Sequence, residues 1–464
     1  MRKRILVLSL IGAMAIIGMG CGTGNAGTET PADDSGAAAQ EDLDSVDDEE
    51  MDSEQDNTVQ DNAGQDGTEQ DDVEQDDTEQ TEDEPGQISI LQLNIEKRSI
   101  DEGVDSTAIE FVENMKLGWN LGNTFDAYTD DNMADEMSYE SYWCGIVTTK
   151  EMIDAIKSAG FETIRIPVSW HNHVSDDGKY TISEAWLNRV QEVVDYAMDN
   201  DMYVILNIHH DNSTKYLYPT QEYLEQSKSY VGSVWTQVAG RFADYDEHLI
   251  MEGMNEPRMV GTNYEWWIDL NNQECVEAVQ CINELNQLFV DTVRASGGYN
   301  KERYLLVPGY DASLHGATNE YFELPQDTAG NLNKILVEVH GYTPYNFALQ
   351  PPNESGSTDQ WSKDSVGSIS EINSMMDKLY ETYVKNGTGV VIDEFGARDK
   401  GGNTQARTDF AAFYIAAARA RGITCCWWDN GSFAGDGENF AIFDRQTCEF
   451  PFPELVEGMM KYSE

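Results

Sequence analysis

The chain has 464 residues, and because 85 are Asp or Glu and only 29 are Lys or Arg, its formal net charge is -56. Its folded part offers no basic stripe that could meet phosphate groups, so we do not expect it to bind nucleic acid. This length allows two or three domains, or one large barrel with additional segments.

Residues 1–21 have the pattern of a secretory signal. Three basic residues at 2–4 precede an apolar run at 5–20, which is shorter than the roughly 20 residues that span a bilayer. The small residue Gly20 before Cys21 is similar to a bacterial lipoprotein processing site. We therefore expect an exported, cell-surface lipoprotein that contacts a membrane only through a lipid on Cys21, with simple secretion as the alternative.

Residues 22–87 form an acidic segment that contains neither Lys nor Arg and almost no large apolar side chain. Such a segment buries too little surface to offset the entropy lost on ordering, so we predict a disordered linker. Repulsion between its carboxylates should keep the linker extended. Residues 88–464 are apolar and aromatic enough for one large core, and we expect them to form one monomeric domain.

From about residue 106, short apolar runs alternate with helical patterns. Eight runs predict strands, at residues 116–121, 163–167, 203–208, 249–254, 304–307, 335–339, 390–393 and 423–428. Helical patterns lie at residues 148–160, 184–200, 231–242, 277–295, 371–385 and 404–420. We expect Ser183 to cap the second of these helices, and the pattern from Thr148 to Glu151 is typical of a capping box.

Eight strands that alternate with helices predict an α/β fold, in which a parallel (β/α)8 barrel, the TIM barrel, follows the signal and the linker. A doubly wound open sheet would show a similar alternation. The strand count and the polar residues just after the strands favour the barrel, because the active sites of barrels form at that end.

Two glutamates that are far apart in the sequence stand at predicted strand ends. Glu256, in an Asn-Glu-Pro string, and Glu394, in an Asp-Glu-Phe-Gly string, each end an apolar run. Hydrolysis of a glycosidic bond needs two carboxyl groups that face each other across a cleft. Taken singly, the Asn-Glu-Pro string could equally be an ordinary turn from a strand into a loop, and an Asp-Glu-Phe-Gly string is more often the start of a loop than a nucleophile.

Six strings occur in order along the chain: Gly118-Trp119-Asn120-Leu121-Gly122-Asn123-Thr124, Asn207-Ile208-His209-His210, Asn255-Glu256-Pro257, Val339-His340-Gly341-Tyr342-Thr343-Pro344, Asp393-Glu394-Phe395-Gly396 and Trp428-Asp429-Asn430-Gly431. With them the chain, from about residue 110 onward, resembles glycoside hydrolase family 5 and most closely its endoglucanase-like subfamily 4. The chain departs from the family after Trp143, where Cys144-Gly145-Ile146 stands in place of the common Gly-Asn-Pro.

This resemblance implies that Glu256 is the acid/base and Glu394 the nucleophile. The supporting catalytic residues would be Arg165, His209, Asn255, His340 and Tyr342, and the residues expected to bind substrate are Asn123, Trp143, His210 and Trp428. The implied activity is that of a retaining endo-β-1,4-glucanase, which hydrolyses internal bonds of β-glucan polysaccharides by double displacement. The alternatives are an endo-hydrolase of the same family that acts on xyloglucan, mixed-linkage glucan, mannan or xylan, and, less favoured, an inactive carbohydrate-binding surface protein.

The residue types agree with these roles. The two carboxyl groups of a retaining enzyme lie about 5–5.5 Å apart. One of them must stay protonated, which burial and a nearby negative charge achieve by raising its pKa, and we expect this of Glu256. Glu394 should stay ionised, because the fixed donors of Arg165 favour a carboxylate.

No cofactor and no metal are expected. His209, His210 and Asp211 could form a metal site together with His340, since histidine and carboxylate are common ligands. Adjacent histidines on a strand point to opposite faces, however, so the hydrolase is the favoured interpretation.

The cysteines after residue 21 indicate no metal site either, because their spacing is not that of ligand pairs. Cys425 and Cys426 are expected to be small buried hydrophobes. A disulfide remains open among Cys144, Cys275, Cys281 and Cys448, because sequence alone does not assign pairs.

Overall fold

The structure is a computed structural model that describes residues 93, 95–130, 133–330, 333–435 and 437–464. The predicted signal and linker, and with them Cys21, lie outside these residues. Across the described ranges, no helix combines the length and the apolar character needed to cross a membrane.

In the described part of the chain, eight parallel strands close into a barrel in which each strand pairs with the next and β8 pairs with β1. They are β1 Leu117–Asn120, β2 Thr163–Ile166, β3 Tyr203–Asn207, β4 Leu249–Glu252, β5 Leu305–Pro308, β6 Ile335–His340, β7 Val390–Phe395 and β8 Thr424–Trp427. The predicted (β/α)8 barrel is confirmed, and the open sheet is wrong. The predicted strand ends differ from the observed ones by no more than two residues.

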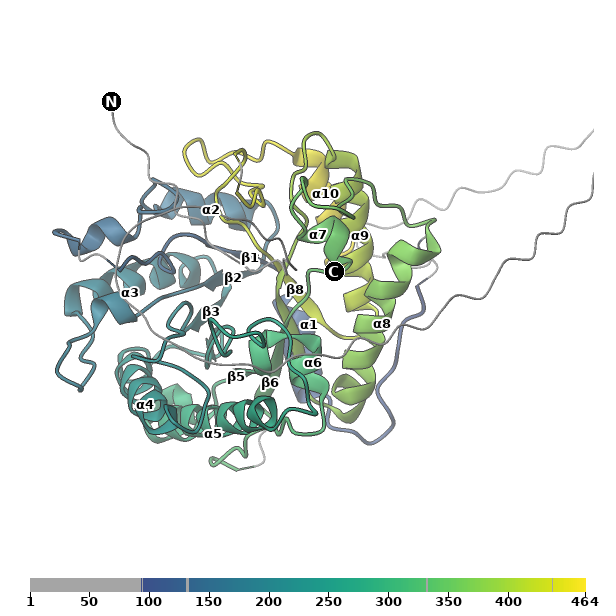
Figure 1. The fold of residues 1–464 in the computed structure, drawn as a ribbon. Helices are drawn as coiled ribbons and strands as arrows, with labels where there is room; N and C mark the ends of the chain where they lie inside the picture. Colours follow the sequence, from purple (N-terminus) through teal and green to yellow (C-terminus); the bar gives the residue numbers. More distant parts are fainter. Residues whose placement is uncertain (1–92, 94, 131–132, 331–332, 436) are drawn as a thin grey trace, which may run out of the picture. The chain divides into compact units, whose positions relative to one another are not determined.

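Helices surround the barrel (Figure 1). Their bounds are α1 Thr107–Met115, α2 Lys150–Ser158, α3 Glu184–Met198, α4 Leu224–Arg241, α5 Gln273–Ala295, α6 Leu314–Thr318, α7 Tyr345–Ala348, α8 Val366–Thr382, α9 Thr404–Arg419 and α10 Pro453–Met460. All the predicted helices are present, but α4, α5 and α8 begin before the predicted starts. In α4 the turn that follows Leu224 is polar, so the apolar periodicity becomes visible only from Val231.

Both predicted caps differ from the observed helix starts. Ser183 precedes α3, but its hydroxyl donates to Glu136 Oε2 at 2.7 Å instead of capping the helix. The residue before α2 is Thr149, and its side chain makes no capping hydrogen bond. The backbone N–H of Thr148 donates to Glu140 Oε1 at 2.8 Å. A carboxylate from another part of the chain therefore binds the backbone N–H that the capping-box pattern assigned to a side chain of the helix itself.

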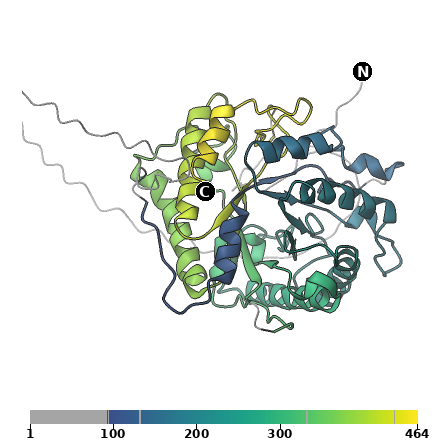
Figure 2. The same ribbon diagram turned by 180° about the vertical axis from the view of Figure 1, so that it is seen from behind.

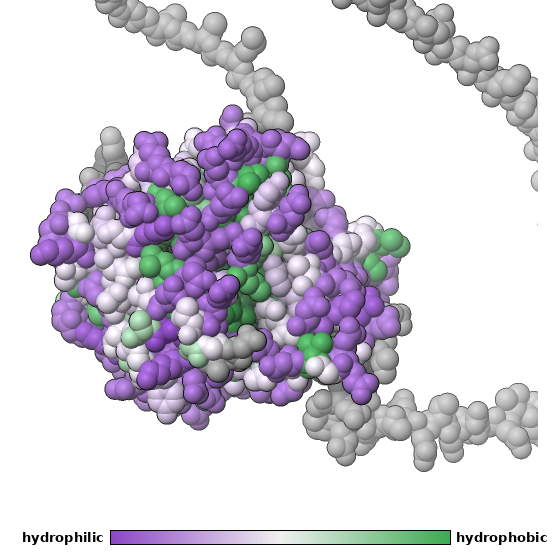
Figure 3. All heavy atoms as spheres, turned by 90° about the horizontal axis from the view of Figure 1, so that it is seen from below, coloured by the Kyte–Doolittle hydropathy of each residue, from purple (hydrophilic) through white to green (hydrophobic). Residues whose placement is uncertain are grey.

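The face of the molecule in Figure 3 is mostly hydrophilic, and its apolar side chains form small separate groups. Such a distribution is typical of a surface that faces water. All six cysteines among the described residues are free, and Cys425 and Cys426 are buried as expected.

Helix α1 closes one end of the barrel with an apolar plug (Figure 2). Its buried face carries Ala108, Phe111, Val112 and Met115. These side chains share a cluster with one residue from each of six strands, namely Ile205, Ile250, Leu306, Leu336, Val391 and Cys426. The barrel interior is therefore dry at this end, and polar groups further along the strands lie in a medium where charges interact strongly.

Gly118 of β1 is required by the packing at this plug. A Cβ atom at Gly118 would lie 2.3 Å from Cys426 Sγ, closer than real atoms approach, and in tight contact with Thr163 Cβ at 3.2 Å. The short strand β1 can therefore pair with both β2 and β8 only because it has no side chain at this point.

We predict that Gly118→Ala lowers the free energy of unfolding by about 1–3 kcal/mol, because the added methyl group overpacks the core. Urea denaturation measures the loss. The double variant with Cys426→Ala should regain part of it, since the clashing sulfur is gone. Gly240→Ala in α4 is the matched control, because a Cβ there meets nothing within 4 Å. Equal losses in the two single variants would contradict this packing argument.

Candidate active site

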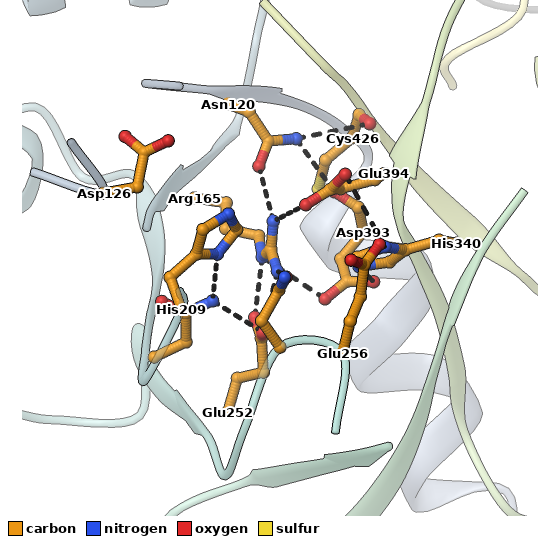
Figure 4. A network of polar contacts seen from close by, with 12 residues as sticks. Asn120, Asp126, Arg165, His209, Glu252, Glu256, His340, Asp393, Glu394 and Cys426 are labelled. Atoms are coloured by element: carbon orange, nitrogen blue, oxygen red, sulfur yellow. Dashed lines mark hydrogen bonds and ion pairs between the residues drawn. The ribbon is translucent and has the colours of Figure 1, made fainter. Parts of the chain in front are cut away.

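Arg165 on β2 lies wholly buried at the centre of the polar network in Figure 4. Its Nε and Nη2 donate to the two carboxylate oxygens of Glu252, each at 2.7 Å. Its Nη1 donates to Glu394 Oε1 at 2.6 Å and to Asn120 Oδ1 at 3.0 Å, and Nη2 also donates to Asn255 Oδ1 at 2.6 Å. One guanidinium thus holds groups from four neighbouring segments in fixed positions.

The two predicted catalytic glutamates are close neighbours. One carboxylate oxygen of Glu256, one of Glu394 and a ring nitrogen of His340 all lie within 4.8 Å of one another. His340 Nδ1 is 2.7 Å from Glu256 Oε1 and 3.6 Å from Glu394 Oε2. The Tyr342 hydroxyl donates to Glu394 Oε2 at 3.0 Å. The spacing of the carboxyl groups agrees with the about 5–5.5 Å of retaining glycosidases.

A bulge in β7 brings Glu394 to this position. Glu338 on β6 pairs with Val391, and His340 pairs with Glu394, so two steps along β6 correspond to three along β7. The pairing with β8 shifts at the same place. Consecutive residues of a regular strand face opposite sides, but an extra residue lets two neighbours face the same side. Asp393 and Glu394 therefore both point into the barrel, toward Arg165.

The expected protonation of Glu256 is wrong for the free protein. Burial raises the pKa of Glu256, but Arg258, whose Nη1 is 2.9 Å from Oε2, and the hydrogen bond with His340 lower it to about 2. Burial lowers the pKa of His340, but the charge of Glu394 and the bond to Glu256 raise it to about 9. The proton of this pair therefore resides on His340, because two cations flank the carboxylate.

His209 and His210 lie side by side, contrary to the expectation that they point apart. Their ring centroids are 4.3 Å apart. Strand β3 ends at Asn207, so the alternation of a strand no longer applies to these two residues. Asn207 Nδ2 lies 3.0 Å from His209 Nδ1. Burial lowers the pKa of His209 well below its ordinary value and that of His210 to about 4, so both rings are neutral near pH 7.

The metal set considered from the sequence is not assembled. Asp211 accepts hydrogen bonds from the Trp170 backbone and the Tyr230 hydroxyl, and it contacts the His171 ring. Three other groups have donor atoms within 4.8 Å of one another: Asp126 with His209 and His210, Glu256 with His340 and Glu394, and Glu338 with His340 and Asp393. Distance alone does not make these atoms ligands, and the absence of a metal stays a prediction.

The predicted substrate-binding residues are linked by a chain of contacts. Asn123, in a left-handed turn with φ 56°, donates its backbone N–H to Asp126 Oδ2 at 3.0 Å. His210 Nε2 is 3.9 Å from the same carboxylate oxygen, and its ring centroid is 5.7 Å from that of Trp143. Trp428 stacks parallel to His209 with centroids 5.9 Å apart, and His209 in turn contacts His210.

The sequence analysis missed several charged residues of the site. Glu252 and Glu338 are wholly buried inside strands, and Arg258 bonds Glu256. Burial raises the pKa of Glu438, Arg398 opposes the rise and the charges of the catalytic glutamates add to it, for a pKa of about 7. A usable signal existed for the first two residues, because a glutamate inside an otherwise apolar run must face a partner when it is buried.

We predict that Arg165→Met lowers the free energy of unfolding by about 3–5 kcal/mol at pH 7, because it leaves Glu252 and Glu394 buried without a counter-charge. Urea denaturation at pH 7 measures the loss. Arg241→Met, which removes a pair whose Glu184 side chain is largely exposed, should cost about 1 kcal/mol or less. Similar losses in the two variants would argue against uncompensated carboxylates.

A family pattern and several curated relatives match this chain. The pattern described as cellulase (glycosyl hydrolase family 5) matches residues 125–434. Endoglucanase 1 of Ruminococcus albus is 41% identical over 359 residues, which are 77% of this chain and 82% of that protein. The cellulase/esterase CelE of Acetivibrio thermocellus is 40% identical over 359 residues, and the match covers 77% of this chain but only 40% of CelE.

Solved structures agree with this match. A mutant of the glycoside hydrolase 5 lichenase from Caldicellulosiruptor sp. F32, in complex with cellotetraose, is 56% identical, with 80% of this chain and 98% of that chain covered and a TM-score of 0.78. A GH5-4 broad specificity endoglucanase from Ruminococcus champanellensis, with bound cellotriose, is 43% identical, with coverage of 78% and 100% and a TM-score of 0.70. With its closed barrel and paired glutamates, this chain belongs to glycoside hydrolase family 5.

Proposed function

We propose that the protein is a retaining endo-β-1,4-glucanase in which Glu394 is the nucleophile and Glu256 the acid/base. The observation that carries this proposal is the approach of their carboxylate oxygens to within 4.8 Å of one another at the carboxyl ends of the strands. Every group of the site comes from one chain, so a monomer suffices, which light scattering of the purified protein tests.

The surroundings of Glu394 suit an attack on the anomeric carbon. Arg165 and Tyr342 donate to different oxygens of its carboxylate, at 2.6 and 3.0 Å. These bonds hold the carboxylate in a fixed orientation. Burial and the charge of Glu394 raise the pKa of Tyr342 well above its ordinary value, so the phenol keeps its proton and remains a donor.

The acid step needs a proton on Glu256, and His340 supplies it. Its Nδ1 is 2.7 Å from Glu256 Oε1, so the proton of the pair moves across one hydrogen bond. Neutral Glu256 then protonates the leaving sugar oxygen while Glu394 forms the glycosyl-enzyme. In the second step the Glu256 carboxylate takes a proton from water, which hydrolyses the intermediate and restores the pair.

The proposed substrate is a β-1,4-linked glucan. Support comes from the two solved relatives with bound cellotetraose or cellotriose. Trp143 is half-buried near His210, and Trp267, on the loop after the acid/base, is 62% exposed and stacks on His315. Exposed aromatic faces at a cleft are suited to stacking on sugar rings. A lichenase among the relatives makes mixed-linkage glucan the second candidate substrate.

We predict that the wild-type protein releases reducing ends from carboxymethyl cellulose and barley β-glucan, with an early fall in viscosity because internal bonds are cleaved. Glu394→Gln should abolish release from both polymers and leave the melting temperature nearly unchanged. A reducing-end assay that also includes xyloglucan, mannan and xylan defines the preference. Near-normal turnover by Glu394→Gln would refute the nucleophile assignment, and oligosaccharide binding without any product would indicate an inactive binding protein.

A substrate whose leaving group needs no proton separates the two roles. On an aryl β-cellobioside with an acidic phenol, Glu256→Gln should still form the glycosyl-enzyme and give a burst of phenol. Steady turnover should then be slow, because no base activates water. Glu394→Gln should give no burst. A burst in the second variant and none in the first would reverse the assignment.

We also propose that the protein is exported and tethered by a lipid on Cys21. The support is the sequence alone, namely the basic residues at 2–4, the apolar run at 5–20 and the small residue before the cysteine. The acidic segment at 22–87 would then hold the enzyme away from the membrane as an extended tether.

When the full chain is expressed in bacteria fed a labelled fatty acid, we predict that the wild type carries the label and fractionates with membranes. Cys21→Ala should carry none. Cys448→Ala is the control, because this free, half-buried cysteine is not the lipidation site and should leave the label in place. An unlabelled wild type in the culture medium would support simple secretion instead.

A further inference from the structure

Beneath the catalytic glutamates lies a second pair of carboxyl groups, Asp393 and Glu338. Both side chains are wholly buried. Within the residues that the structure describes, none of their four oxygens has a hydrogen-bond partner. Buried carboxylates ordinarily accept several hydrogen bonds, so a pair without donors calls for a physical explanation.

The charges around this pair do not balance if every carboxyl group is ionised. Arg165 Nε is 3.3 Å from Asp393 Oδ2, but this guanidinium already donates to Glu252 and Glu394. Those two carboxylates face the pair from β4 and β7, and the buried thiol of Cys426 faces it from β8. Removing two further negative charges from water here would cost several kcal/mol each, and bound protons avoid that cost.

Burial is the largest cause that raises the pKa values of Asp393 and Glu338 well above their ordinary range. The charges of Glu252 and Glu394 raise them further, and Arg165 opposes the rise. These raised pKa values agree with the lack of hydrogen-bond donors and with the unbalanced negative charges around the pair.

Asp393 also faces Nε2 of His340, the ring nitrogen that is not bonded to Glu256. Nε2 of His340 is 3.6 Å from Asp393 Oδ1, whereas Nδ1 is bonded to Glu256. Among the described residues this Nε2 has no hydrogen-bond partner. The partner of one imidazole nitrogen decides which nitrogen keeps the proton when the ring is neutral.

We propose that Asp393 and Glu338 stay protonated in the folded enzyme and that Asp393 holds the proton of neutral His340 on Nε2, so that Nδ1 exchanges a proton with Glu256. The inference rests on the proposed roles of the catalytic glutamates. Asp393 is then a positioning residue that acts on the reaction through His340. Asp393 Oδ1 lies 3.6 Å from Nε2, beyond hydrogen-bond distance, so a neutral Asp393 favours the proton on Nε2 through the dipole of its carbonyl group and not through a formed hydrogen bond.

The protonation state is tested without any activity measurement, so its failure is distinct from a failure of the catalytic assignment. Infrared spectra in heavy water at neutral pH are compared between the wild type and the double variant Asp393→Asn/Glu338→Gln. We expect the wild type to show absorption of protonated carboxylic acids that the variant lacks. A difference spectrum with carboxylate bands in its place would overturn the proposal.

Stability gives a second measurement. A carboxyl group with a raised pKa in the folded state stabilises fully below its unfolded pKa of about 4.3 and loses this contribution as the pH rises. The melting temperature of Glu338→Gln minus that of the wild type should therefore increase steadily from pH 5 to pH 9. A difference that does not change with pH would mean that Glu338 is ionised.

The role of Asp393 is tested by two replacements of similar size. Asn keeps a carbonyl oxygen that can face His340 Nε2, and Leu does not. Asp393→Leu should lower kcat/KM by roughly 10–100-fold and move the alkaline limb of its pH profile to lower pH, because the imidazolium loses the oxygen dipole that faces Nε2. Asp393→Asn should restore most of the activity and the profile. Equal losses in both variants would overturn the proposal, and so would activity that requires added Zn²⁺ after chelation. If the Leu variant does not fold, the infrared spectra and the stability series decide.

Discussion

The arrangement of the site depends on one buried cation, Arg165. A guanidinium inside a closed barrel has no water to solvate it, so its donors must all find acceptors within the protein. It finds them in Asn120 at the end of β1, Glu252 on β4, Asn255 after β4 and Glu394 on β7. Because the network is buried, removing any one partner would leave a charge without its counter-charge, which is strongly destabilising.

The apolar plug of α1 strengthens the interactions between these charged groups. By closing the barrel below the polar network, Phe111 and its neighbours keep water out, so charges act on one another with little screening. The consequence is visible where positive and negative groups compete. Two cations beside Glu256 keep it ionised in the free protein, and His340 carries the proton that the acid step requires.

Much of this could be predicted from the sequence, for a physical reason. The carboxyl ends of parallel strands gather at one rim of a barrel, so Glu256 and Glu394 meet although a long stretch of chain separates them. What could not be predicted depends on local departures from regular geometry. His209 and His210 lie beyond the end of β3, where strand alternation no longer holds. Arg258 is near Glu256 in sequence, but only the loop conformation decides that its charge reaches the carboxylate.

The bulge in β7 positions both the nucleophile Glu394 and the buried carboxyl group of Asp393. In a regular strand a single register step turns a side chain to the opposite face, so a strand without the extra residue could point only one of Asp393 and Glu394 inward. With the extra residue, the nucleophile reaches the cleft while its neighbour enters the dry interior below it. The uncompensated carboxyl beneath His340 is therefore a consequence of the same backbone irregularity that positions the nucleophile. Loss of the bulge would turn one of these two carboxyl groups away from the barrel interior, so the nucleophile and the buried acid below it depend on the same extra residue.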